Sequence, residues 1–220
     1  MAVTGLYTTR DIVEQAFIKL GIGGIGEDIS GEEYRQGLIE LDMMLKGWQN
    51  RGLCRWLRAT QTVTLTTAAS YTLNPKRPLS IESVRIKVNG IETPLTRMTA
   101  EEYDNLPQKT STGRPSTYFY DRQRENALLY VWPVLAAANG ETLEIAYTRE
   151  IDDLRTGSAT IDLPGEWWET VVYNLASRLA DTFEVQADRV TARAELMLRD
   201  ALAFDREESL FWGEAYGDEY

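Results

Sequence analysis

The spacing of apolar residues changes twice along the chain, and both changes predict a change of secondary structure. Apolar positions three and four residues apart indicate amphipathic helices, and this spacing is found in residues 8–20, 30–52, 163–183 and 187–208. Between the second and third of these segments, apolar and polar residues alternate in short runs, as in half-buried strands. The chain therefore has a helical arm at each end and a strand-rich centre.

The two helical arms cannot each bury an apolar stripe alone, so we expect them to pack together. The strand-rich centre is then an insertion into a helical bundle. We predict an α+β fold. Residues 1–57 and 161–208 form the helical bundle, residues 58–160 form an inserted antiparallel β-module of about six strands, and residues 209–220 form a C-terminal tail.

Local signals mark the ends of the first two helices. Thr8 or Thr9 can cap the first helix, because a threonine hydroxyl accepts a hydrogen bond from an amide of the first turn. Gly21 is a natural stop for that helix. Ser30 followed by Glu33 is a capping-box pattern, so we expect the second helix to begin at Ser30.

Two hairpins are expected in the central module. Asn89-Gly90 between alternating runs is the strongest short hairpin signal. The stretch RPSTYFYDRQRENALLYVWP predicts a second hairpin, with strands at 118–120 and 128–132 that belong to the module core. The DRQREN segment between them should be a solvated tip. Its charged residues are Asp121, Arg122, Arg124 and Glu125. Such charges are compatible with contact to a neighbouring subunit and equally with plain solubility.

The six tryptophans are candidates for core and interface anchors, since aromatic side chains bury a large area. Trp48 and Trp168 lie on helical stripes, so we expect both in the core. Trp167 should not easily share the buried face with its neighbour. Trp212 lies in the tail and has no helical partner.

The last helix is expected to bury one face, formed by Val190, Ala194, Met197 or Leu198, Ala201 and Phe204. The segment that follows, SLFWGEAYGDEY, is aromatic and acidic and has no periodicity. Large aromatic residues in an acidic tail suggest docking to a partner, here through Leu210, Phe211, Trp212, Tyr216 and Tyr220. The alternatives are a tail that packs on its own helices or a disordered end.

The composition removes most catalytic chemistry. The 220 residues include no histidine, which excludes Ser-His-Asp and Cys-His catalysis and most zinc sites. The single cysteine, Cys54, excludes an internal disulfide framework and a cysteine-based metal site. We therefore predict that the protein is not an enzyme and uses no cofactor or metal. The sequence also contains no apolar run long enough for a membrane span and no signal peptide.

Carboxylate pairs leave an enzymatic alternative, because glycoside hydrolysis needs two carboxylates across one bond. The alternative function is a carboxylate-dependent cell-wall glycoside hydrolase. Its candidate pairs are Glu101/Glu102, Asp152/Asp153 and Glu166/Glu169. A third possibility is a carbohydrate-binding module that stacks sugars on aromatic rings, although the flanking helices count against it.

A glycine pattern follows the first helix. Gly21, Gly23 and Gly26 match the G-x-G-x-x-G fingerprint of dinucleotide-binding proteins. That fingerprint requires a strand before it and a helix that opens at the glycines. Here a helix comes before it, so we interpret the segment as an interhelical loop.

The net charge of −11 is unevenly placed. Residues 1–59 carry eight acidic and seven basic residues, residues 60–161 carry twelve and eleven, and residues 162–220 carry fourteen and five. Proteins that hold DNA need clustered lysine and arginine to displace counterions. This chain lacks such a cluster, so it should repel the DNA backbone.

With this layout assembled, the chain resembles the head-to-tail adaptor proteins of tailed bacteriophages, and among them the tail accessory factor, or packaged-DNA stabilisation protein, of short-tailed phages. The resemblance spans essentially the whole chain. The segments that carry it are TTRDIVEQAFIKLGI, GEEYRQGLIELDMMLKGWQNRG, RPLSIESVRI, TGRPSTYFYD, LLYVWP, ETLEIAYTRE and IDLPGEWWETVVYNLASRLAD.

The resemblance implies a structural protein of the virion. Members of this family form a ring, typically of twelve copies, beneath the portal protein; they lengthen the DNA channel and present a platform for tail proteins, such as nozzle or tail-tube proteins. It further implies that the C-terminal segment reaches the portal, that DNA passes without specific binding, and that the chain meets no membrane. Its location would be the head-to-tail junction, and the host cytoplasm before assembly. The hydrolase alternative would then be carried in a phage tail, and the hairpin tip could contact a tail protein.

Overall fold

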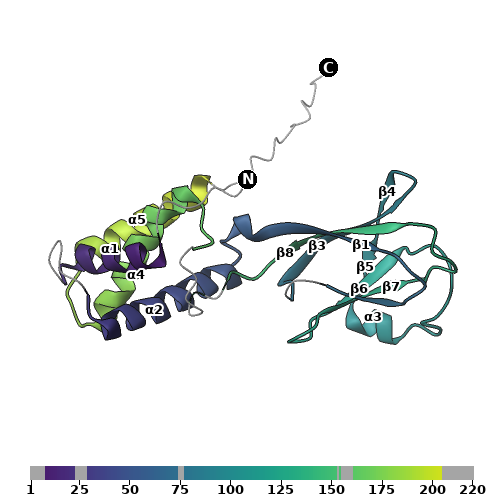
Figure 1. Cartoon of the computed structure of the whole chain (residues 1–220), viewed down its shortest axis with the longest axis horizontal. Helices are drawn as coiled ribbons and strands as arrows, with labels where there is room; N and C mark the ends of the chain where they lie inside the picture. The colour runs from purple at the N-terminus through teal and green to yellow at the C-terminus, as the bar shows by residue number, and fades with distance from the viewer. Residues whose placement is uncertain (1–7, 23–28, 74–76, 153, 155–160, 205–220) are drawn as a thin grey trace, which may run out of the picture. The chain divides into compact units, whose positions relative to one another are not determined.

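The computed structural model describes residues 8–22, 29–73, 77–152, 154 and 161–204. Contacts between Cα atoms divide the chain into two compact units: Met1–Gly47 with Asp153–Tyr220, and Trp48–Asp152. The first unit is helical and the second is built of two sheets (Figure 1). The predicted α+β class is confirmed.

Helices from both arms form the first unit, as expected. The helix α4 packs against α1 of the N-terminal arm and against α5. The elements are α1 (Thr9–Leu20), α2 (Gly31–Asn50, whose last residues fall in the second unit), the short 3-10 turn η3 (Gly165–Trp167), α4 (Trp168–Thr182) and α5 (Asp188–Phe204).

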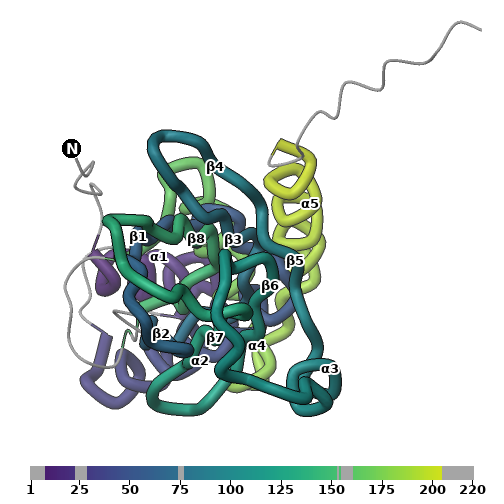
Figure 2. Tube along the Cα trace, turned by 90° about the vertical axis from the view of Figure 1, so that its right-hand side faces the viewer, coloured from purple at the N-terminus to yellow at the C-terminus, as the bar shows by residue number. Residues whose placement is uncertain are grey.

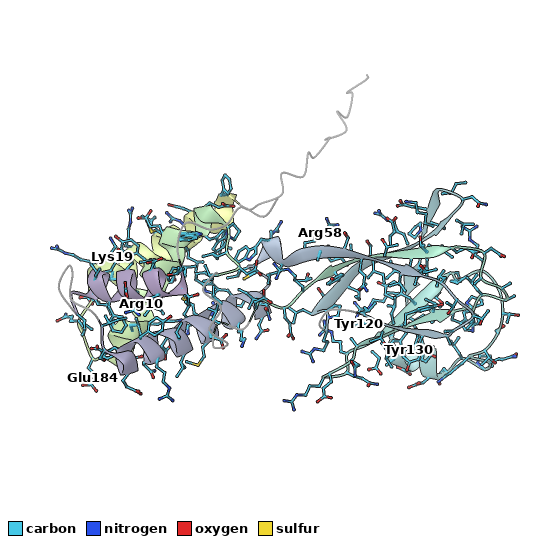
Figure 3. The ribbon with its side chains drawn as sticks, in the orientation of Figure 1. Arg10, Lys19, Arg58, Tyr120, Tyr130 and Glu184 are labelled. Carbon is cyan, nitrogen blue, oxygen red and sulfur yellow. The ribbon has the colours of Figure 1, made fainter. Side chains whose placement is uncertain are left out.

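Aromatic contacts join α1 to its neighbours. The buried ring of Phe17 meets the ring of Phe183 edge-on, with centroids 5.4 Å apart. Two cations of α1, both labelled in Figure 3, lie over rings of other helices: Arg10 over Tyr34 of α2 and Lys19 over Tyr173 of α4. Each such contact contributes roughly 0.5–1 kcal/mol at exposed sites, so α1 is fixed by its apolar face and by its rim.

Both predicted helix starts are confirmed. Thr8 caps α1, and its amide and hydroxyl donate hydrogen bonds to Asp11, which lowers the pKa of that carboxyl. Ser30 and Glu33 form the expected capping box, with Ser30 N–H to Glu33 Oε2 at 2.7 Å and Glu33 N–H to Ser30 Oγ at 3.2 Å. Gly21 ends α1 with φ 74°, a conformation that glycine adopts without a steric penalty.

The tryptophan predictions are partly wrong. Trp48 and Trp168 are buried, as expected. Trp167 was expected off the buried face, yet its side chain is 0% exposed. It lies in the 3-10 turn that precedes α4, so the angular spacing of an α-helix does not relate its direction to that of Trp168. Both rings can therefore enter the interior.

The backbone of α2 lies close to α1 at Gly37. A Cβ atom built at this position would lie 2.5 Å from Cγ1 of Val13, a fully buried side chain of α1. Valine is stiff at χ1, so it cannot turn away within a packed core. The absent side chain at Gly37 is therefore what allows this helix contact.

We predict that Gly37→Ala lowers the free energy of unfolding by roughly 1–3 kcal/mol through overpacking. Gly47→Ala is the matched control, because a Cβ there meets nothing within 4 Å. The control should gain roughly 0.5–1 kcal/mol from lower backbone entropy in the unfolded chain. Urea unfolding measures both values, and equal effects of the two substitutions would contradict the close approach.

The second unit is a sandwich of two four-stranded sheets, ordered β1-β8-β3-β4 and β2-β7-β6-β5. In Figure 2, β1 and β2 lie at one side of the two sheets and β5 at the other. The bounds are β1 (Arg58–Thr64), β2 (Ser70–Thr72), β3 (Ser80–Val88), β4 (Ile91–Pro94), β5 (Thr96–Arg97), β6 (Thr117–Asp121), β7 (Leu128–Trp132) and β8 (Thr142–Thr148). A short 3-10 turn, η1 (Arg55–Leu57), precedes β1, and a short helix, α3 (Ala100–Asp104), follows β5.

Both predicted hairpins are present. Asn89 and Gly90 have positive φ angles, 49° and 82°, and connect β3 to β4. The pairing of β6 with β7 aligns Tyr118 with Val131 and Tyr120 with Leu129. These four side chains are buried in one core shared by the two sheets. The antiparallel prediction holds except for the short parallel pair β5 and β6.

Tyr120 is the most perturbed phenol of this core. Its side chain, labelled in Figure 3, is 5% exposed, and its hydroxyl donates a hydrogen bond to the Pro78 carbonyl oxygen. Burial raises the pKa of Tyr120 to about 12. The folded chain therefore retains a proton that the unfolded chain, with a phenol pKa of about 10, loses first.

We predict that this phenol lowers stability as the pH rises from about 10 to 12, because only the unfolded state ionises in that window. At about pH 9, Tyr120→Phe should be less stable than the wild type by about 1 kcal/mol, owing to the lost hydrogen bond. Near pH 11.5 the phenol of the unfolded wild type is ionised, which should lower the stability of the wild type relative to Tyr120→Phe by up to about 2 kcal/mol. The difference between the two chains should therefore shrink or reverse. Urea unfolding at both pH values tests this, and a constant difference would refute it.

Candidate partner-binding surfaces

The tip of the β6–β7 hairpin is a charged surface, as predicted. Arg122, Arg124 and Glu125 are exposed, and Asp121 is half-buried at the end of β6. The amide of Gln123 donates a hydrogen bond to Asp121 at 2.8 Å. Within the described part of the chain, these four charged side chains form no ion pair, so their charges are available to a partner.

The outer face of this hairpin is covered by α3, a contact that no pattern in the sequence predicts. Tyr103 of α3 lies 5.1 Å from Phe119 and 5.0 Å from Tyr130, and the last two rings are 5.9 Å apart, centroid to centroid. Lys109 lies over the Tyr103 ring at 4.7 Å. The alternation along the two strands could have predicted an aromatic outer face that needs cover. Phe119 and Tyr130 point to the face of the hairpin opposite the one on which Tyr118 and Tyr120 are buried. The rings pack on one another and hold the hairpin against α3.

Basic side chains of the β1-β8-β3-β4 sheet form ion pairs with carboxylates. Lys87 lies 3.0 Å from Glu144 and 3.5 Å from Glu92, and the hydrogen bond to Glu144 raises the pKa of this lysine. Arg58, labelled in Figure 3, lies 2.7 Å from Glu82. A DNA phosphate would have to displace these carboxylates, so this face is not a phosphate-binding surface.

The contact between α4 and α5 is polar. Asn174 donates hydrogen bonds to the carbonyl oxygens of Thr170 at 2.8 Å and Ala194 at 3.1 Å. Ser177 and Thr191 hydroxyls are 3.0 Å apart. Ala194 is the buried residue of α5, so hydrogen bonds from α4 to the backbone of α5 define how the two helices align.

The predicted buried face of α5 is wrong at its end. Phe204 is 76% exposed. Thr170 lies across from Met197, Asn174 from Ala194 and Ser177 from Thr191. In this antiparallel alignment Phe204 lies across from the segment before α4 begins, and periodicity within α5 carries no information on that overhang.

Other exposed large apolar side chains in the described residues are Met43, Ile91 and Leu196, with 49%, 69% and 38% of their surface accessible. The predicted docking residues of the tail, Leu210, Phe211, Trp212, Tyr216 and Tyr220, lie outside the described residues. Leu196 and Phe204 are thus exposed apolar side chains in the last turns of α5, and residues 205–208 separate this helix from the tail.

The carboxylates considered for glycoside hydrolysis cap a helix or are exposed at the surface. Thr99 donates its amide and hydroxyl to Glu102 in a capping box, which lowers the pKa of that carboxyl. A general acid needs a raised pKa. Glu166 and Glu169 are exposed at the start of α4, Asp152 is exposed, and Asp153 lies outside the described residues.

One pocket of 320 Å³ opens in the β-unit beside Ile86, Val88, Arg114 and Leu135. Its carboxylate is Glu141, whose pKa is lowered by a hydrogen bond from the Asn139 amide. The pocket lining is mostly apolar and holds one carboxylate, whereas hydrolysis requires two.

The glycine pattern after the first helix does not fit a dinucleotide-binding fingerprint, because a helix and not a strand precedes it. α1 precedes Gly21, while Gly23 and Gly26 lie outside the described residues. Over the described ranges, no group of three or more His, Cys, Asp or Glu side chains could hold a metal ion. No helix of the described chain is both long and apolar enough to cross a membrane.

Residues 33–213 match the family model for the SU10 adaptor protein, and the chain belongs to this family. This agrees with the resemblance to phage head-to-tail adaptors, and the protein is a structural phage adaptor and virion component. No curated protein matches the chain.

We predict that Asn174→Leu loosens α5 without unfolding the helical unit, because it removes two hydrogen bonds worth about 1–2 kcal/mol together. Hydrogen exchange of the α5 amides should accelerate roughly tenfold, while that of α1 should stay unchanged. Ser177→Ala, at an exposed hydroxyl pair, should have a smaller effect. Unchanged exchange in α5 would show that apolar packing, and not Asn174, holds this helix.

Proposed function

We propose that the protein assembles into a ring beneath the portal, extends the DNA channel and offers a platform to tail proteins. Before assembly it would reside in the host cytoplasm. The resemblance implies twelve copies. Such a ring requires head-to-tail contacts, in which two different surfaces of the chain meet.

The proposal rests on how few side chains of α5 are buried. This helix has 17 residues, and among them Ala194 alone is buried. Leu196 and Phe204 remain accessible in its last turns, and four charged residues, 205–208, separate them from the aromatic tail. Clusters of large apolar side chains at an exposed helix end favour a protein partner. We assign portal docking to this region, with Leu210, Phe211, Trp212, Tyr216 and Tyr220 as anchors.

The charge distribution supports passage of DNA without binding. The helical unit carries 23 acidic and 10 basic residues, and the β-unit carries 11 and 13. An acidic surface repels the phosphate backbone, and the repulsion extends over a Debye length of about 8 Å at physiological salt. We therefore propose that the helical unit borders the channel.

The charged hairpin tip suits a contact away from DNA. Asp121, Arg122, Arg124 and Glu125 combine both signs within five positions. Opposite charges on a partner would set orientation and association rate more than affinity. We propose that this tip contacts a neighbouring subunit or a tail protein.

We predict that the full chain adds to purified portal rings and that deletion of residues 209–220 weakens this addition at least tenfold. Native mass spectrometry of the mixture gives the number of added copies, and a thermal melt of the free chain gives its stability. The melting temperature of the deletion variant should match the wild type, since the deleted segment follows a completed helix.

The double substitution Arg122→Glu with Arg124→Glu tests the hairpin tip. It should reduce ring closure or tail-protein addition.

Two outcomes would overturn these assignments. A chain that never adds to portal rings would end the adaptor proposal in this form. A deletion that lowers the melting temperature and the docking equally would assign the tail to the fold and not to the portal.

A further inference from the structure

The strand β1 is a long sheet edge without the usual protection. Exposed edges invite pairing with other chains, and proteins shorten, charge or interrupt them with proline. The edges β2 and β5 have three and two residues. The edge β4 has four residues and ends at Pro94. β1 has seven residues, with no proline and no charge after Arg58.

The β1 ladder shows which backbone groups point outward. Leu65 N–H donates to Glu141 and Arg149 N–H donates to Leu57, so the odd-numbered residues of this strand bond to β8. In an antiparallel ladder the alternate residues direct their N–H and C=O groups to the other side. These are Arg58, Thr60, Thr62 and Thr64. Within the described part of the chain, β1 is an end strand, and these outward groups form no backbone hydrogen bond to a further strand.

The same reasoning shows that β4 is blocked. Leu95 N–H donates to Val84 at 2.8 Å, so Pro94 falls on the alternate, outward-facing side of its ladder. Proline has no N–H to offer there. β1 is therefore the long edge of this unit that can accept a full strand.

The surroundings of β1 carry no charge. Residues 59–75 contain no Asp, Glu, Lys or Arg, in a chain in which 26% of residues are charged. This stretch includes β1 and β2, which lie at the same side of the two sheets in Figure 2. Two copies of a chain with net charge −11 repel one another, and a neutral edge is where they can approach closely.

We propose that two copies of this chain pair through β1, edge to edge and antiparallel, into one continuous eight-stranded sheet. A second copy matches because β1 is self-complementary. With the outward residues bonded in pairs, Arg58 lies opposite Thr64 and Thr60 lies opposite Thr62 of the other copy. No like charges face each other, and threonine pairs across strands are favourable.

This contact differs from the contact of a ring. A two-fold pairing uses the same surface on both copies and closes at two, whereas a ring needs two different surfaces. The pairing is therefore a property of the free chain in solution. The pairing through β1 can be absent while the adaptor proposal holds, and it can be observed while the adaptor proposal fails.

Sedimentation equilibrium of the full chain over a range of concentrations tests the pairing. The wild type should fit twice the chain mass of 25.0 kDa at the higher concentrations. Thr62→Pro removes an outward N–H and leaves the bonds to β8 intact, so it should sediment as the single chain. Thr62→Val is the matched control, since it keeps the N–H and the β-branched shape, and it should pair like the wild type.

A variant that leaves the backbone unchanged guards against misfolding by proline. Thr60→Lys with Thr62→Lys places like charges opposite one another and should raise the dissociation constant at least about tenfold. A mixture of Thr60→Lys chains with Thr62→Glu chains should form the mixed pair preferentially. The proposal is overturned by a wild type that is monomeric at all concentrations, by a Thr62→Pro chain that is folded by circular dichroism and still pairs, or by pairing that ignores the lysines.

Discussion

The rest of this structure depends on the packing of α1 against α4, two helices that lie about 150 residues apart in sequence. Closing this contact brings the ends of the intervening chain together, and an inserted unit must then start and finish at neighbouring points. The β-unit does so. Its first strand, β1, pairs with its last, β8, and the ladder continues outward through Leu57 and Arg149 to the hydrogen bond between Ile151 N–H and the Gln49 side chain. Entry and exit of the insertion are thus held side by side.

Periodicity predicted the elements because it records which side of each helix or strand is apolar. Thr8, Ser30 and Gly21 set helix ends through hydrogen bonds with residues three or four positions away, so a short window of sequence contains the whole interaction. Periodicity mispredicts a side chain whose direction depends on structure outside that short window. Trp167 turns inward because a 3-10 turn changes the angle before α4, and Phe204 stays exposed because α5 extends past the start of its neighbour.

The sandwich shows the same division. Asn89-Gly90 fixed one hairpin, but no local signal assigns strands to two sheets or makes β1 an edge. A bulge between Ile81 and Ser83 adds one residue to β3 and lets Ile81, Val84 and Ile86 all face the core, although strict alternation would turn one of them out. The exposed hairpin tip was predictable from its charges, whereas the cover of α3 over Phe119 and Tyr130 depends on tertiary packing.

The two units solve opposite electrostatic problems. Carboxylates beside Lys87 and Arg58 neutralise bases of the β-unit, which leaves this unit nearly balanced and able to approach other proteins. The helical unit keeps an excess of 13 acidic residues, which costs self-repulsion within a small volume. The proposed position beside the DNA channel gives this acidic excess a function, namely repulsion of a polyanion. If the helical unit borders the channel as proposed, its acidic excess keeps the phosphate backbone from adhering at each subunit, whereas a basic wall would slow the DNA.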